Sequence, residues 1–337
     1  MRVLVLGGTW FLGRAVVVEA LRRGHDVTTF NRGKTGQDVP GAQVVRGDRS
    51  RHGDLAAAVA AGPFDVVVDP SGYVPVDVAA AAHALAARVG RYVFVSTVDA
   101  YEDWPHAPIT ERSPLHECPP DVAWGSLPYG HLKAGCERAL AAAWPGELVV
   151  VRPGVLLGVR EPKGRLPWWL RRMERGGRVL APGEPERRLQ PVDVRDAAAF
   201  VVDLAEGRAD GPVNVVAPQG HTTMRRLLQA CAAVVERNAE LVWLPDDALV
   251  AAGVREWTEL PMWRPAPGTW AVDATRARAA GLVCRPVTQT VADTWRWMKS
   301  GQQVAEHWRT AEHGIDPAKE GELLRSWLGE VRPGPGR

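Results

Sequence analysis

The chain has 337 residues, of which 46% are hydrophobic and 24% charged, and these values are ordinary for a globular protein. This length allows one large domain or two moderate ones. The 41 Lys and Arg residues nearly balance the 39 Asp and Glu residues, and the resulting net charge of +2 leads us to expect neither a membrane partner nor a nucleic acid partner.

The amino-terminal sequence and the cysteines exclude further classes of protein. The apolar run Val3–Leu6 ends at Gly7 and Gly8, so it is too short for a signal peptide or a membrane span, and we expect a cytoplasmic protein. The four cysteines stand alone, without CxxC or CxxxH spacing. We therefore expect no metal site and no disulfide framework.

Short β-branched runs alternate with alanine-rich helical stretches through the first 150 residues. Strands are expected at Arg2–Leu6, Val27–Phe30, Gln43–Val45, Val66–Asp69, Tyr92–Val95 and Leu148–Val151, with a later one at Pro212–Val216. Helices are expected near residues 11–23, 54–61, 76–89 and 127–143, and later at 223–236 and 317–329. This alternation predicts an α/β protein with a doubly wound parallel sheet, which binds ligands at the carboxyl ends of its strands.

The composition changes after residue 155, where Pro, Arg and Trp become frequent. We therefore divide the chain into a sheet domain at residues 1–155 and a smaller, interleaved C-terminal substrate lobe at 156–330. Within that lobe, residues 190–220 are expected to return to the main sheet. Residues 331–337 are expected to form a disordered tail.

A glycine-rich loop joins the first expected strand to the first expected helix. It reads Gly7-Gly8-Thr9-Trp10-Phe11-Leu12-Gly13, and we expect all seven residues to contact a dinucleotide. Gly7 permits a tight turn, Gly13 lets the helix pack closely, and the amides at the helix start face the pyrophosphate. Trp10 stands where a glycine is usual, and we expect its ring to cap the cofactor cleft. The alternative for the whole loop is a structural strand-to-helix turn that binds no dinucleotide.

The end of the second strand indicates which dinucleotide binds. An NAD enzyme would offer Asp or Glu to the ribose 2′-hydroxyl here, whereas this chain has Asn31 and Arg32. Arg32 indicates a 2′-phosphate, so NADP(H) is favoured over NAD(H); a solvated arginine in a turn is the alternative. Asp48, just after the third strand, can accept a hydrogen bond from the adenine amino group.

The strongest signal is Tyr129-Gly130-His131-Leu132-Lys133 on a predicted helix, preceded by Ser96 and Thr97 at the end of a strand. Residues i and i+4 share a helix face, so the Lys133 ammonium can lie beside the Tyr129 phenol. A neighbouring cation favours the phenolate and brings proton transfer toward neutral pH. Thr97 can hold the substrate oxygen from the opposite side. Thr97, Tyr129 and Lys133 are therefore the candidate catalytic residues.

Together these motifs resemble the extended short-chain dehydrogenase/reductase family, the NAD-dependent epimerase/dehydratase group, over roughly residues 1–300. The first loop is most similar to an atypical branch that reads GGTRFLG and contains reductases, epimerase-like proteins and chloroplast RNA-binding members. The resemblance implies a Rossmann-like dinucleotide-binding domain at 1–155. It places Gly7, Gly8 and Gly13 at the pyrophosphate, Thr97 and Tyr129 at the reacting oxygen, and Lys133 at the nicotinamide ribose.

Further residues complete the expected site. Those expected at the cofactor are Pro70, Ser71, Ser96 and Pro153, and those expected at the substrate are Asp99, Tyr101 and Arg188. Arg188 ends a basic run that begins at Arg160, for which we considered a solvated helix face, a clamp for an anionic substrate and an RNA-binding patch. The string at 191–196 is expected to be a turn with a buried acid, and that at 281–286 a C-terminal closure.

The sequence predicts an NAD(P)-dependent oxidoreductase that moves hydride between the nicotinamide and a carbonyl or alcohol of a small molecule, with Tyr129 as general acid and base. A cofactor-retaining sugar-nucleotide epimerase is the first alternative. A non-catalytic nucleotide- or RNA-binding protein of the same fold is the second. The run Thr97-Val98-Asp99 lacks the Thr-Asp-Glu of the family's dehydratases, so no dehydration of nucleotide sugars is expected. Members of the family often pair through helices, and we consider a homodimer.

Overall fold

The computed structural model describes residues 1–303 and 307–329, and the expected tail at 331–337 lies outside these residues. The chain forms two compact units. Unit 1 comprises residues 1–156, 190–218 and 267–285, and unit 2 comprises 157–189, 219–266 and the described residues from 286 onward. Every helix within the described ranges is too short or too polar to span a bilayer.

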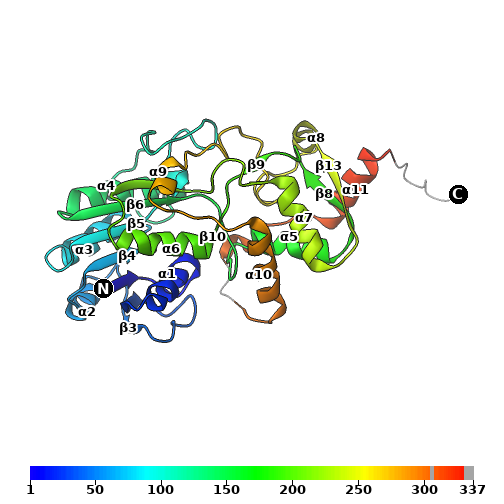
Figure 1. Ribbon diagram of the computed structural model, residues 1–337. Helices are drawn as coiled ribbons and strands as arrows, with labels where there is room; N and C mark the ends of the chain where they lie inside the picture. Colours follow the sequence, from blue (N-terminus) through cyan, green and yellow to red (C-terminus); the bar gives the residue numbers. More distant parts are fainter. Residues whose placement is uncertain (304–306, 330–337) are drawn as a thin grey trace. The chain divides into compact units, whose positions relative to one another are not determined.

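Unit 1 is built on a parallel sheet of seven strands (Figure 1). The strands are β1 (Arg2–Leu6), β2 (Asp26–Asn31), β3 (Gln43–Arg46), β4 (Val66–Asp69), β5 (Arg91–Val95), β6 (Glu147–Pro153) and β11 (Gly211–Val215). Their order is β11-β6-β5-β4-β1-β2-β3, with every neighbouring pair parallel. This confirms the expected doubly wound α/β fold, and β11 lies beside β6 in the main sheet.

Helices cover both faces of the sheet because side chains alternate along each strand. In β1, Val3 and Val5 pack in one core cluster, whereas Leu4 and Leu6 pack in another. The first cluster is covered by α1 (Phe11–Arg22) and α6 (Val194–Ala205), and the second by α2 (His52–Ala60), α3 (Pro75–Leu85) and α4 (Tyr129–Ala143). Near-continuous apolar strands were therefore the correct signal for a sheet buried on two sides.

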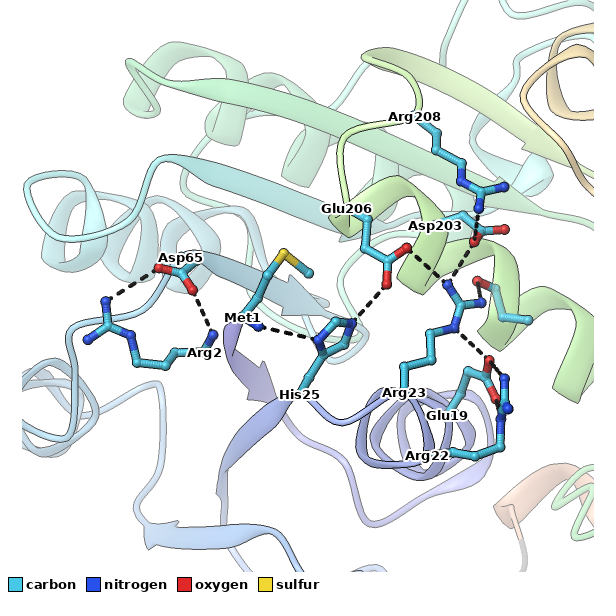
Figure 2. A network of polar contacts seen from close by, with 11 residues as sticks. Met1, Arg2, Glu19, Arg22, Arg23, His25, Asp65, Asp203, Glu206 and Arg208 are labelled. Atoms are coloured by element: carbon cyan, nitrogen blue, oxygen red, sulfur yellow. Dashed lines mark hydrogen bonds and ion pairs between the residues drawn. The ribbon is translucent and has the colours of Figure 1, made fainter.

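A polar network fastens α1 to α6 (Figure 2). Arg23, which follows α1, donates hydrogen bonds to Asp203 at 2.7 Å and to the Ala199 carbonyl at 2.9 Å, both in α6. His25 Nε2 lies 2.9 Å from Glu206 Oε1, just beyond α6. The same helix α1 carries the glycine loop at its amino end, so this network fixes the helix that presents the loop.

The segments 191–196 and 281–286 have the structural roles expected from the sequence. Asp193 is buried and caps α6 by accepting from the Arg195 backbone N–H at 2.9 Å. Arg285 donates to Asp196 at 2.7 Å and thereby closes the segment 267–285 against α6. The other elements of unit 1 are η1 (Val98–Ala100), β10 (Val192–Asp193) and α9 (Thr275–Ala279).

Unit 2 is a helical body with short sheets. Its helices are α5 (Arg165–Glu174), α7 (Met224–Val235), α8 (Asp246–Ala251), α10 (Val287–Lys299), η2 (Trp308–Glu312) and α11 (Pro317–Trp327). Strand β8 (Gly177–Pro182) pairs in parallel with β13 (Ala239–Leu244), and β9 (Arg188–Leu189) pairs antiparallel with β12 (Thr222–Thr223). The basic run is not a uniformly solvated face, because Arg172 is buried and ion-paired with Glu320 at 2.8 Å.

Candidate active site

The loop after β1 is a tight turn that requires glycine. Gly7 and Gly8 have φ angles of 120° and 95°, which only glycine adopts readily. A Cβ on Gly13 would lie 3.0 Å from Pro70 Cγ and 3.2 Å from the Gly8 nitrogen. Gly13 therefore lets α1 begin in close contact with the turn that follows β4.

The amino end of α1 suits an anionic group. The first hydrogen bond inside the helix runs from Arg14 N–H to the Trp10 carbonyl at 3.1 Å. The amides before Arg14 therefore lie at the positive end of the helix dipole. Directly after strand β5, the buried Ser96 hydroxyl has no hydrogen-bond partner among the described residues, as expected of a group that awaits a polar ligand. These features fit a dinucleotide.

Leu12 and Thr9 are held by other parts of unit 1, and the cofactor contacts expected of Thr9, Trp10 and Phe11 stay predictions. Leu12 is buried in the core between the sheet and α6, so only its backbone remains for the expected cofactor contact. The Thr9 hydroxyl lies 2.7 Å from that of Thr35, which ties the loop to the segment after β2. Trp10 and Phe11 are half-buried.

Charged side chains of both signs lie at the carboxyl ends of β2 and β3. Arg32 is exposed, with 54% of its side chain accessible, and its Nη1 lies 3.7 Å from Asp48 Oδ2. Asn31 is buried and its Oδ1 accepts from the Gly33 N–H at 2.8 Å and from Arg46. Asn31 therefore holds the turn after β2. Arg46, which the sequence did not single out, is a second arginine at this edge of the sheet and forms an ion pair with Asp38.

Thr97 and Tyr129 begin the two elements at the carboxyl end of β5. Thr97 caps η1, where its hydroxyl accepts from the Asp99 N–H at 3.2 Å. Tyr129 is the first residue of α4 and is 38% exposed. A Cβ on Gly130 would lie only 1.9 Å from the Asp99 carbonyl oxygen, so glycine is what allows α4 to begin directly against η1.

Lys133 is buried and bound to two backbone carbonyls. It is 1% exposed, and its Nζ donates to the Gly72 carbonyl at 2.5 Å and to the Val95 carbonyl at 2.6 Å. Desolvation of the hydroxyl raises the pKa of Tyr129 well above its usual value, and the neighbouring Tyr73 and Asp99 add to this rise. These groups oppose the phenolate in the protein without a ligand, and the effect of Lys133 on Tyr129 stays a prediction.

The expected substrate contacts separate into three cases. Tyr101 is fully buried, accepts from Arg152 at 2.8 Å and donates to Asn214 at 2.7 Å, so its assignment to the substrate is wrong. Asp99 is half-buried beside the start of α4. Arg188 is exposed on β9 of unit 2, and its substrate contact stays a prediction.

The expected cofactor residues at the ends of β4 and β6 are partly or fully buried. Pro70 and Ser71 are half-buried beside the glycine loop, whereas Pro153 is buried at the end of β6. Arg152, next to Pro153, forms a buried ion pair with Glu137 at 2.5 Å and serves the core rather than a ligand. Across the described part of the chain, no three His, Cys, Asp or Glu side chains gather in a way that could hold a metal ion.

The sequence matches the model of the NAD dependent epimerase/dehydratase family over residues 3–217. It is also similar to the chloroplast stem-loop binding protein of 41 kDa b of Arabidopsis thaliana, with 24% identity over 247 residues. That match covers 68% of this chain and 62% of the relative, so the chain spans less than two thirds of that protein's length.

Solved structures share the fold. The Bordetella bronchiseptica enzyme WbmH in complex with NAD+ gives a TM-score of 0.66 at 20% identity, covering 88% of this chain and 98% of that chain. UDP-glucose 4-epimerase of Thermotoga maritima with UDP-glucose gives 0.67 at 18% identity, with 90% and 100% covered. The enzyme of the same name from Thermus thermophilus with NAD gives 0.64 at 21% identity, again with 90% and 100% covered. Because the family model spans well over half of the chain, the protein belongs to the NAD-dependent epimerase/dehydratase family.

Proposed function

We propose that this protein is an enzyme that uses a nicotinamide cofactor to oxidise or reduce the alcohol or carbonyl carbon of a small molecule. The observation that carries the proposal is that α4, which Tyr129 begins, starts directly against η1, which Thr97 caps after β5, with Lys133 buried one helical turn beyond Tyr129. The glycine loop opens at the same edge of the sheet, two strands along.

The roles of the residues follow from their positions. Gly7, Gly8 and the first amides of α1 would hold the pyrophosphate, and the bound cofactor would accept or donate hydride. Tyr129 transfers a proton to or from the substrate oxygen. Thr97 offers its hydroxyl proton to the same oxygen, because its own oxygen already accepts from the Asp99 N–H. Lys133, whose Nζ donates to the Gly72 and Val95 carbonyls, would assist at the nicotinamide ribose.

A cofactor-retaining epimerase is the second candidate, and family membership favours it at least as strongly. UDP-glucose 4-epimerases are among the structures that share this fold, and epimerisation needs the same three side chains. A panel of nucleotide sugars and simple ketones distinguishes the two reactions. A net change in nicotinamide absorbance supports the oxidoreductase, whereas a new stereoisomer without net change supports the epimerase.

The similarity to a stem-loop binding protein makes RNA binding the competing outcome. The near-neutral charge of the chain and the Tyr129–Lys133 pair favour the enzyme. RNA retention that falls steeply with salt, together with no cofactor binding and no turnover, would replace the proposed function with the RNA-binding one.

We expect NADP(H) to bind more tightly than NAD(H). Arg32 is exposed at the end of β2 and paired with Asp48 only at 3.7 Å, so its guanidinium can turn to a 2′-phosphate. Arg32→Ala should narrow or reverse the difference between the two dissociation constants, measured by calorimetric titration. Lys34→Ala, which removes another exposed cation from the same loop, should leave the difference unchanged. Equal constants in the wild type would contradict the prediction.

We expect Trp10→Gly to change cofactor affinity by less than about tenfold, or ~1.4 kcal/mol, because the helix-start amides stay in place. Gly13→Val should instead lose about 1–3 kcal/mol of stability and most of the binding, since its Cβ alone would lie 3.0 Å from Pro70 Cγ and 3.2 Å from the Gly8 nitrogen. Thermal melting and cofactor titration measure both effects. Complete loss of binding in Trp10→Gly would show that the indole itself holds the cofactor.

A further inference from the structure

The turn at residues 69–72 connects the glycine loop to Lys133. On one side, Pro70 and Ser71 pack so closely against the loop that a Cβ on Gly13 would lie 3.0 Å from Pro70, and one on Gly7 would lie 3.3 Å from Ser71. On the other side, the Gly72 carbonyl accepts from Lys133 at 2.5 Å. A shift of this turn would therefore disturb both the expected phosphate site and the lysine.

A buried carboxylate holds the turn in place. Asp69 is 0% exposed, and its two oxygens accept from Arg49 Nη1 and Nη2 at 2.8 and 2.7 Å. Oδ1 also accepts from the Ser71 N–H at 3.0 Å, and Oδ2 accepts from the Tyr92 hydroxyl at 2.8 Å. This bidentate pair with two further donors satisfies the carboxylate without solvent.

Asp69 also contributes to the charge balance around Lys133. Burial lowers the pKa of Lys133 to about 8, a decrease that nearby anionic groups oppose and Arg49 reinforces. The titratable groups that act on it are Asp69, Glu137, Cys136 and Arg49, and the rings over its Nζ are Phe94 at 4.2 Å and Tyr73 at 5.3 Å. Glu137 lies on α4 itself, where it pairs with Arg152 at 2.5 Å. Asp69 is the carboxylate that shares a turn with Gly72, whose carbonyl accepts from the lysine.

We propose that the Arg49–Asp69 ion pair is the positioning device of Lys133. It fixes the turn whose Gly72 carbonyl receives the lysine amine, and it supplies the buried negative charge that stabilises the ammonium form. Its importance for catalysis rests on the proposed function, in which Lys133 assists at the nicotinamide ribose. Asp69 acts through Lys133 and is a positioning residue.

The lysine itself provides the test. The chain has five lysines, so protein labelled with ¹³C at lysine Cε gives few resonances, and the one absent from Lys133→Arg belongs to Lys133. In cofactor-free wild type, this resonance should titrate with a midpoint near 8. Asp69→Asn should lower the midpoint by about one pH unit, because Arg49 then faces Lys133 without the carboxylate. Arg49→Met should raise it.

Tyr92→Phe is the matched control, because it removes a hydrogen bond from the same carboxylate but no charge. Its midpoint should equal that of the wild type. Opposite shifts in the two charged variants separate electrostatics from a general loosening of the core. If Asp69→Asn does not fold, the test is the comparison of the Lys133 titration midpoint between Arg49→Met and the wild type. A wild-type midpoint near the ~10.4 of an exposed lysine, or an unchanged midpoint in every variant that folds, would overturn the proposal.

Cofactor titration separates this inference from the proposed function. Asp69→Asn should weaken binding of NAD(H) and NADP(H) by about tenfold or more, since the displaced turn no longer supports the glycine loop, while Tyr92→Phe should bind within about threefold of the wild type. If the wild type binds neither cofactor, the proposed function fails. The NMR midpoints still report on the ion pair in that case.

Discussion

Tyr129→Phe should reduce turnover by about 10²–10⁴-fold, or ~2.7–5.5 kcal/mol in activation free energy, and leave cofactor affinity nearly unchanged. The change removes only the hydroxyl that exchanges a proton with the substrate oxygen. The ring, whose centroid lies 6.3 Å from that of Tyr73, stays in place. The measurement is the rate of conversion of whichever substrate the panel identifies, with cofactor affinity determined in parallel.

Tyr73→Phe is the control for this experiment, since it removes a neighbouring hydroxyl that transfers no proton in the mechanism, and its turnover should stay close to that of the wild type. An ordinary tyrosine is protonated at neutral pH, and the upward shift of the Tyr129 pKa keeps this hydroxyl protonated in the free protein. It is therefore ready to act as the acid in reduction. Wild-type turnover in the Tyr129→Phe variant would assign the proton transfer to another group.

Gly130→Ala should destabilise the protein by at least about 1–3 kcal/mol and abolish turnover. The new methyl carbon would lie 1.9 Å from the Asp99 carbonyl oxygen, and a backbone atom cannot move away as a flexible side chain could. The start of α4 must then separate from η1. Tyr129 would move away from Thr97 with it.

Gly53→Ala is the matched substitution, because Gly53 also occupies the second position of a helix and nothing lies within 4 Å of its added carbon. Alanine there should stabilise the protein by up to about 1 kcal/mol through the loss of glycine's freedom in the unfolded chain. Thermal melting of both variants gives the comparison. Equal melting temperatures would show that α4 and η1 can separate at no cost.

The sequence by itself determined most of the sheet. Expected strands at Arg2–Leu6 and Val66–Asp69 coincide with β1 and β4, and the strand expected at 212–216 is found one residue earlier as β11. These predictions were correct because apolar runs and glycine punctuation are local signals. The helix expected at 76–89 ends at Leu85, since alanine-rich sequence gives no sharp end signal.

The motifs also indicated which segments meet at the carboxyl edge, because a parallel sheet brings the ends of its strands together. The partners of the individual side chains required the tertiary structure. Lys133 is paired with carbonyls 61 and 38 residues away, and the Tyr101 hydroxyl with an amide 113 residues away. No local pattern contains such pairings. Burial and neighbouring charge, which depend on the packed chain, decided that Tyr101 is structural and that the pKa of Tyr129 is raised rather than lowered.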